Sequence, residues 1–137
     1  GNRLTVGAPA KLTHDEGNNS QPSFTPDGRA VVFSATRDTG ADARSDIYRI
    51  DLATRAERAL THDGSDVIVN GTSDWVYEEE LGLRDGFRWS PDGTRIAFYR
   101  FDQSPEPQYP ILDQSAVHAK TVLIRYPQPG DAMPGFD

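Results

Sequence analysis

Two short segments of this chain each occur twice, and this internal repetition constrains the fold more than any other feature. Leu-Thr-His-Asp at Leu12–Asp15 returns at Leu60–Asp63. A Pro-Asp-Gly turn stands at Pro26–Gly28 and again at Pro91–Gly93. Proline presets the first corner of a turn, and aspartate and glycine tolerate the dihedral angles that follow. Repeats of about 40–50 residues built in this way are typical of β-propeller blades.

The segments between the turns have the patterns of strands. Apolar runs after the two turns predict strands at residues 30–33 and 96–99. Polar and apolar residues alternate at 46–51, as in a half-buried strand, and a turn is expected at 53–55. Prolines break the C-terminal part into short extended pieces, in which 121–126 is the one clear strand. Twelve glycines and ten prolines suit such a turn-rich chain.

We therefore predict an all-β fold, a partial β-propeller of about two blades and part of a third. A propeller closes with at least four blades, so we expect the chain to be a fragment of a larger propeller domain. The two Pro-Asp-Gly turns lie further apart than the two Leu-Thr-His-Asp segments, which predicts an insertion in the repeat. The expected organisation is a generic blade at residues 10–70, an inserted acidic helix at 71–86, and the next blade with an extended tail at 87–137.

The insertion carries an unusual acidic run, in which Asp74 and an aromatic pair are followed by Glu78, Glu79 and Glu80. One interpretation is a solvated helix that Asp74 caps, with acidic residues near its start favoured by the helix dipole. The other is a site for a protonated amine, because an ammonium has three donors and no acceptor and is satisfied by carboxylates. Spacing alone leaves both interpretations open.

Composition excludes several classes of function. The formal charge of −7 disfavours nucleic acid and anionic membranes as partners. The chain has no cysteine, no apolar stretch of membrane-spanning length, and neither zinc-site nor EF-hand spacing, so no cofactor or metal is expected. A Gly-x-Ser-x-Gly nucleophile elbow is also absent, and Ser73 and Ser90 are interpreted as cap or turn residues. No catalytic residue is therefore predicted in these residues.

The acidic run and its surroundings resemble a known family. Residues 70–80, the following Trp-Ser-Pro-Asp-Gly at 89–93, the strand at 96–102 and the Tyr-Pro-Gln-Pro-Gly at 126–130 are similar to the propeller domain of dipeptidyl peptidase IV, a serine exopeptidase of the prolyl oligopeptidase clan. The resemblance covers roughly residues 45–137. The segment before it resembles generic blades such as those of the periplasmic protein TolB.

The resemblance implies specific roles for the acidic segment. In that family it is a short helix that projects into the cavity between the propeller and the hydrolase domain. Its last two glutamates, here Glu79 and Glu80, would bind the free α-amino group of a peptide substrate. Glu78 would support the helix, and Trp75 and Tyr77 would pack it against the blades.

The whole enzyme implied by the resemblance releases N-terminal dipeptides with proline or alanine second. Its Ser-His-Asp triad would lie on an α/β-hydrolase domain of the same polypeptide, outside these residues, and a periplasmic or secreted location is favoured. Gln128, Pro129 and Met133 depart from the family's usual tail, which weakens assignment to a subfamily.

Two other interpretations remain. The chain could be a non-catalytic, TolB-like propeller module for protein–protein interaction, with the acidic helix as its docking surface. An open set of blades could also pair its edges with further copies, which would give a homo-oligomer.

Overall fold

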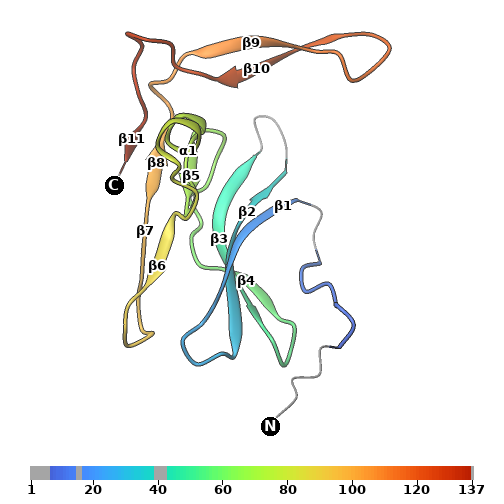
Figure 1. Cartoon of the computed structure of the whole chain (residues 1–137), viewed down its shortest axis with the longest axis vertical. Coiled ribbons are helices and arrows are strands. Elements are labelled where there is room, and N and C mark those ends of the chain that lie inside the picture. The colour runs from blue at the N-terminus through green and yellow to red at the C-terminus, as the bar shows by residue number, and fades with distance from the viewer. Residues whose placement is uncertain (1–6, 15–16, 39–42, 137) are drawn as a thin grey trace.

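The computed structural model describes residues 7–14, 17–38 and 43–136, so Asp15 of the first repeat lies outside the described residues. The elements run in the order β1 (Asn18–Phe24), β2 (Ala30–Arg37), β3 (Arg44–Asp51), β4 (Glu57–Ala59), β5 (Ile68–Asn70), α1 (Trp75–Leu81), β6 (Phe87–Trp89), β7 (Ile96–Phe98), β8 (Arg100–Asp102), β9 (Gln108–Asp113), β10 (Lys120–Arg125) and β11 (Gly135–Phe136). Figure 1 shows these strands as curved ribbons with α1 beside β5 and β8.

The first blade is an antiparallel sheet in the order β1-β2-β3-β4. β2 is its central strand, and its first six residues are buried because both of its faces are covered. Parallel pairing between Ser45 of β3 and Val69 of β5 joins this blade to β5, β8 and β11. β6 and β7 form a separate antiparallel hairpin.

The two Pro-Asp-Gly repeats fold into the same hydrogen-bonded turn. The Thr25 hydroxyl donates to Asp27 at 2.6 Å, and the Ser90 hydroxyl donates to Asp92 at the same distance. The glycine of each turn has a φ of +68°, a left-handed conformation that favours glycine. The hydroxyl of Ser90 and the backbone N–H of Thr94 lower the pKa of Asp92 to about 2. The repeat in sequence is therefore a repeat in structure.

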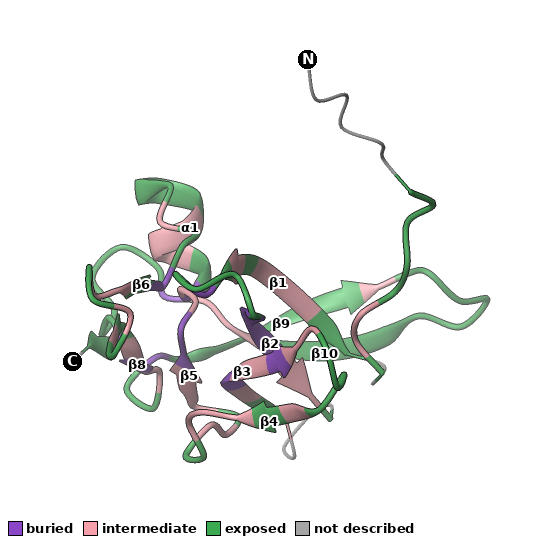
Figure 2. Cartoon of the chain, turned by 90° about the horizontal axis from the view of Figure 1, so that it is seen from below, coloured by how far each residue is buried: buried purple, intermediate pink, exposed green. Residues whose placement is uncertain are grey.

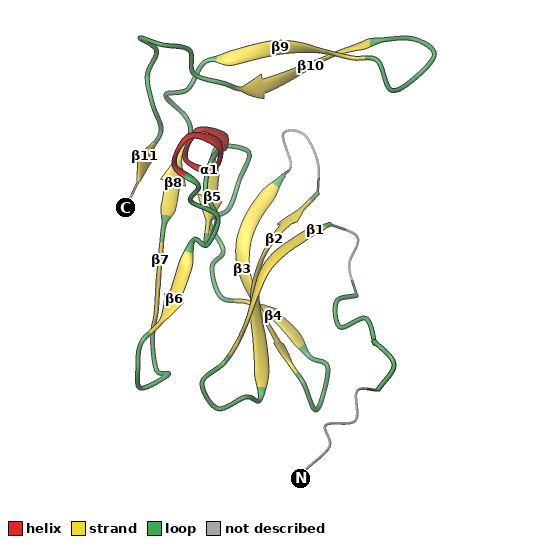
Figure 3. Cartoon of the chain, viewed as in Figure 1, coloured by secondary structure: helices red, strands yellow, loops and turns green. Residues whose placement is uncertain are grey.

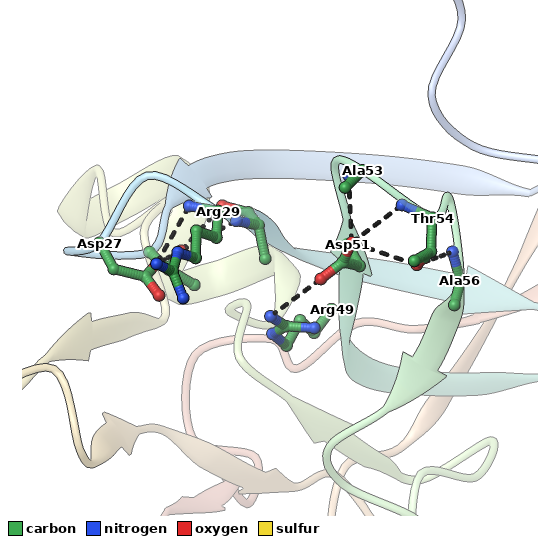
Figure 4. A network of polar contacts seen from close by, with 9 residues as sticks. Asp27, Arg29, Arg49, Asp51, Ala53, Thr54 and Ala56 are labelled. Atoms are coloured by element: carbon green, nitrogen blue, oxygen red, sulfur yellow. Dashed lines mark hydrogen bonds and ion pairs between the residues drawn. The ribbon is translucent and has the colours of Figure 1, made fainter.

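The predicted turn at 53–55 is also present, and Asp51 organises it. One oxygen of Asp51 accepts hydrogen bonds at 3.0 Å from the backbone N–H groups of Ala53 and Thr54, and at 3.1 Å from the Thr54 hydroxyl (Figure 4). Arg49 lies 3.6 Å from the other oxygen. The bonds from Thr54, more than the Arg49 charge, lower the pKa of Asp51.

The core lies on both faces of β2 and β3, which Figure 2 shows as the main buried region. One cluster packs under the N-terminal segment and consists of Val31, Phe33, Ala35 and Ile50, with Leu12, Tyr48 and Leu52 against them. The other cluster packs the first blade against the β6–β7 hairpin and consists of Val32, Ile47 and Phe87, with Leu60, Trp89 and Ile96 against them. The second cluster is the contact between adjacent blades, so the predicted partial propeller is confirmed.

The predicted strand at 96–99 is one residue shorter than expected, because the chain changes sheets at Tyr99. Its backbone N–H donates to Gly86 and its carbonyl accepts from Gly71, both outside the strand ladders. β7 then pairs with β6, and β8 pairs with β5. The ends of the acidic segment are thereby tied to the junction between the two sheets.

A long hairpin of β9 and β10 extends away from the blades (Figure 3). The sequence predicted β10 but not β9, because Pro110 stands in the middle of β9. Each strand of a two-stranded ribbon has one unpaired edge, where the missing N–H of a proline removes no ladder bond. Among the described residues, no helix is long and apolar enough to span a membrane.

Candidate functional site

The acidic segment forms the short helix that Asp74 was predicted to cap. Asp74 has an extended backbone, and its side chain accepts a hydrogen bond of 3.0 Å from the backbone N–H of Tyr77. An aspartate at this position satisfies a free N–H of the first turn. The helix ends at Gly82, which is left-handed and donates its N–H to Glu78, as in a Schellman-type C-cap.

The two aromatic residues of α1 attach it to the rest of the chain: Tyr77 packs against the blade strand β8, as the resemblance implied, whereas Trp75 packs against the end of the β9–β10 hairpin instead of a blade. The ring of Trp75 lies 4.5 Å from that of Tyr126 at the end of the β9–β10 hairpin. The ring of Tyr77 lies 5.1 Å from buried Phe101 in β8 and 5.8 Å from Phe136 in β11. One side of α1 is therefore fixed by contacts between rings.

The ends of the acidic segment cross at two glycines. A Cβ on Gly86 would stand 2.3 Å from the carbonyl carbon of Gly71 and 2.4 Å from the nitrogen of Thr72, too close for any other residue. The hydroxyl of Ser73 donates to the carbonyl of Leu83, which adds a second link between the two ends. This supports the interpretation of Ser73 as a structural residue, and it gives the helix a narrow, fixed base.

Glu79 and Glu80 are exposed in the last turn of α1, which has no basic residue. Glu78 differs from them, because it is half-buried and pairs with Arg84 at 3.6 Å. In the part of the chain that the structure describes, no cationic side chain forms an ion pair with Glu79 or Glu80. Figure 2 shows α1 standing out from the buried strands. The two carboxylates are thus available to a ligand.

A separate cleft lies away from α1. A cavity of about 600 Å³ opens between the two Pro-Asp-Gly turns, and residues from both turns, Ile47, Trp89 and three arginines line it. It contains no residue of α1 and no close set of catalytic groups. In the described residues, no cluster of three or more histidine and acidic side chains has the arrangement of a metal site.

Sequence reasoning missed one residue next to the acidic helix. Glu106 is only 4% exposed, and Asp74, which is 3% exposed, is the charged group that acts most strongly on it. Burial first, and Asp74 second, raise the pKa of Glu106 to about 7. A glutamate between two prolines is typical of an exposed turn, so the sequence carries no signal of this contact.

Comparison with known proteins identifies the family. Residues 3–137 match the sequence pattern of the dipeptidyl peptidase IV (DPP IV) N-terminal region. The chain belongs to this family. Dipeptidyl aminopeptidase B of Saccharomyces cerevisiae is 35% identical over 122 residues, which cover 85% of this chain and 13% of that protein. A probable dipeptidyl-aminopeptidase B of Phaeosphaeria nodorum is 40% identical over 90 residues, which cover 65% of this chain and 9% of that protein.

A solved structure of the dipeptidyl peptidase IV family has the same fold. The crystal structure of Porphyromonas gingivalis dipeptidyl peptidase 4 matches with a TM-score of 0.74 and 30% identity, over 91% of this chain and 17% of that one. The chain therefore spans between 9% and 17% of the length of these three proteins. It is a part of the propeller region of a dipeptidyl peptidase-type protein.

Proposed function

We propose that this chain supplies the substrate anchor of a serine dipeptidyl peptidase, in which Glu79 and Glu80 bind the protonated α-amino group of a peptide. The observation that carries the proposal is the position of these two exposed carboxylates, which pair with no cationic side chain of the described residues, on a helix that ring contacts fix to the rest of the fold. Family membership supplies the context, because the relatives are named for the removal of dipeptides.

The electrostatics of α1 support a cationic ligand. The C-terminal end of a helix carries a partial negative charge, and an acidic side chain there is unfavourable by about 0.3–1 kcal/mol. Glu79 and Glu80 both lie in that last turn, without a basic residue to offset them. A bound ammonium would offset all three negative groups, whereas a purely structural helix would gain from lysine or arginine at the same positions.

Anchoring the amine explains exopeptidase action. A fixed distance between the ammonium site and the reacting hydroxyl admits a set number of residues, here two. The hydroxyl, together with its histidine and aspartate partners, would belong to an α/β-hydrolase domain of the same polypeptide. Cleavage after proline or alanine and a periplasmic or secreted location are further parts of this proposal.

The test uses the full-length enzyme that contains this chain. Glu79→Gln and Glu80→Gln should each lower kcat/KM for a chromogenic dipeptide substrate roughly 10–100-fold, the size expected for losing a hydrogen bond between charged groups. Glu78→Gln is the matched control, because it removes a carboxylate from the same helix that is already paired with Arg84. Full activity in both of the first two variants would refute the assignment.

The alternative of a non-catalytic interaction module makes a different prediction. A docking surface formed by α1 would bind a peptide and its N-acetylated form equally well, because acetylation removes only the ammonium. An amine anchor would bind the acetylated peptide much more weakly than the free-amine peptide. Isothermal titration with this matched pair separates the two functions without any measurement of catalysis.

Self-association is a further proposal. The β9–β10 hairpin exposes Tyr109, Ile111, Leu112, Val122 and Leu123, each between 43% and 57%. The register of the hairpin places Tyr109, Ile111 and Val122 on one face of the ribbon and Leu112 and Leu123 on the other. Exposed apolar side chains on a projecting ribbon are typical of an interaction surface. We expect the full-length enzyme to form a homo-oligomer through this hairpin, which size-exclusion chromatography with light scattering would measure.

A further inference from the structure

Two buried carboxyl groups meet where α1 joins the base of the β9–β10 hairpin. Asp74 caps α1 with one oxygen, which accepts from the Tyr77 N–H. The other oxygen of Asp74 and both oxygens of Glu106 are buried and receive no N–H or hydroxyl donor from the described residues. Asp74 is also the charged group that acts most strongly on Glu106, which makes each carboxyl group the candidate partner of the other.

The backbone around Glu106 is conformationally restricted. Glu106 lies between Pro105 and Pro107, and a following proline restricts its backbone to extended conformations. Its N–H donates to the carbonyl of Gln103 at 3.1 Å, and the carbonyl of Pro107 accepts from the N–H of Tyr126 at 3.1 Å. The backbone on both sides of Glu106 is thus fixed.

Arg125 is the cationic group that lies near this pair, and its hydrogen bonds go elsewhere. It donates to the backbone carbonyls of Gln103 at 3.2 Å and Glu106 at 3.4 Å, and it pairs with Asp66 at 3.5 Å. Asp74 and Arg125 are the charged groups that act on Glu106. Two carboxylates in contact without a cation between them do not both ionise, so one of them must carry a proton.

We infer that Glu106 is a positioning residue that, in its neutral form, donates a hydrogen bond to Asp74 and so ties the N-terminus of the acidic helix to the base of the hairpin. Asp74 already accepts from the helix N–H, which leaves Glu106 as the donor. Loss of the proton would place two negative charges in a buried contact and push α1 away from the hairpin. This inference rests on the proposed function in one respect, because it makes amine anchoring by Glu79 and Glu80 depend on the protonation of Glu106.

The first test is a comparison of kcat/KM between wild type and Glu106→Gln from about pH 5.5 to pH 8.5. The ratio of the two values cancels the titration of the substrate amine and of groups elsewhere in the enzyme. Glutamine is neutral at every pH and its amide still donates to Asp74. We expect the ratio of variant to wild type to be constant below about pH 6 and to rise roughly tenfold by pH 8.5, the order of a lost charge-assisted hydrogen bond. A ratio that stays constant over the whole range would overturn the inference.

A second variant tests the role of Asp74 as the partner of Glu106. Asparagine caps a helix as well as aspartate does, so Asp74→Asn keeps α1 capped. Its amide can donate to an ionised Glu106, so the ratio of kcat/KM between this variant and wild type should also rise above pH 6. A ratio that stays constant over the pH range would show that the proton is not shared with Asp74, and the inference would fail. Asp113→Asn is the matched control, since it changes a half-buried carboxylate of the same hairpin that accepts from the N–H of Ser115.

The two proposals fail in distinguishable ways. If Glu79→Gln and Glu80→Gln keep full activity, the amine anchor is wrong, while thermal stability still reports on the contact between Asp74 and Glu106. If those variants lose activity but the Glu106→Gln ratio and the difference in Tm are both independent of pH, the anchor stands and the positioning role is wrong. Should Glu106→Gln fail to fold, the wild type and Asp74→Asn still provide the comparison.

Discussion

Replacement of Glu106 by glutamine should stabilise the protein at high pH and leave it nearly unchanged at low pH. Burial against Asp74 raises the pKa of Glu106 from 4.5 to about 7. Because the pKa is higher in the folded state, the folded protein holds the proton more tightly than the unfolded chain between these two values. The stability of the wild type is therefore fully present below about pH 4.5, falls as the pH rises from there to about 7, and is constant above it.

The size of this change in unfolding free energy follows from the shift in the pKa of Glu106. Each pKa unit corresponds to about 1.36 kcal/mol, so a rise from 4.5 to about 7 is worth roughly 3 kcal/mol. Glu106 is almost completely buried, so solvent screens this interaction little. Glutamine does not titrate, so the difference in unfolding free energy between variant and wild type should grow by about this amount between pH 4.5 and pH 8.

The assay is differential scanning calorimetry of the full-length enzyme, wild type and Glu106→Gln, in a series of buffers at matched ionic strength. The difference in Tm should change by a few degrees across the series, with the variant gaining as pH rises. Asp113→Asn should show no such trend, because hydrogen bonds to Ser115 lower the pKa of Asp113 and it stays ionised throughout this range. A difference in Tm that is independent of pH would refute the reasoning, since it would mean that Glu106 is ionised in the folded protein.

Two further predictions concern packing and assembly. Gly86→Ala should destabilise the protein by roughly 3 kcal/mol or more, because the added Cβ would lie 2.3 Å from the backbone of Gly71. Gly135→Ala is the control and should change Tm little, because there is open space around the added Cβ. Equal Tm values for the two variants would contradict this prediction. Leu112→Asp and Leu123→Asp, both at exposed positions of the β9–β10 hairpin, should lower the molar mass measured by light scattering without a loss of Tm. An unchanged molar mass would remove the hairpin from the oligomer interface.

The sequence by itself determined the local elements of this protein. The Pro-Asp-Gly turns, the turn at Asp51 and the helix between Asp74 and Gly82 follow from residues that contact neighbours only a few positions away. The turn repeat also revealed the blade architecture, and the acidic run carried the family resemblance. Each of these signals is local, because turn and cap hydrogen bonds and backbone preferences depend on residues that are close together in the sequence.

Tertiary structure decided the rest. The chain changes sheets at Tyr99 because its backbone forms hydrogen bonds with Gly71 and Gly86, which lie outside its own strand. The residues next to Tyr99 in the sequence do not predict these bonds. β9 forms around Pro110 because β10 pairs with it from further along the chain. The pKa of Glu106 is raised because folding buries this side chain and brings Asp74, which is distant in sequence, close to it. Burial and the dielectric environment depend on everything packed around a group, so the pKa of a carboxyl group that looks solvent-exposed in sequence is raised only in the folded protein.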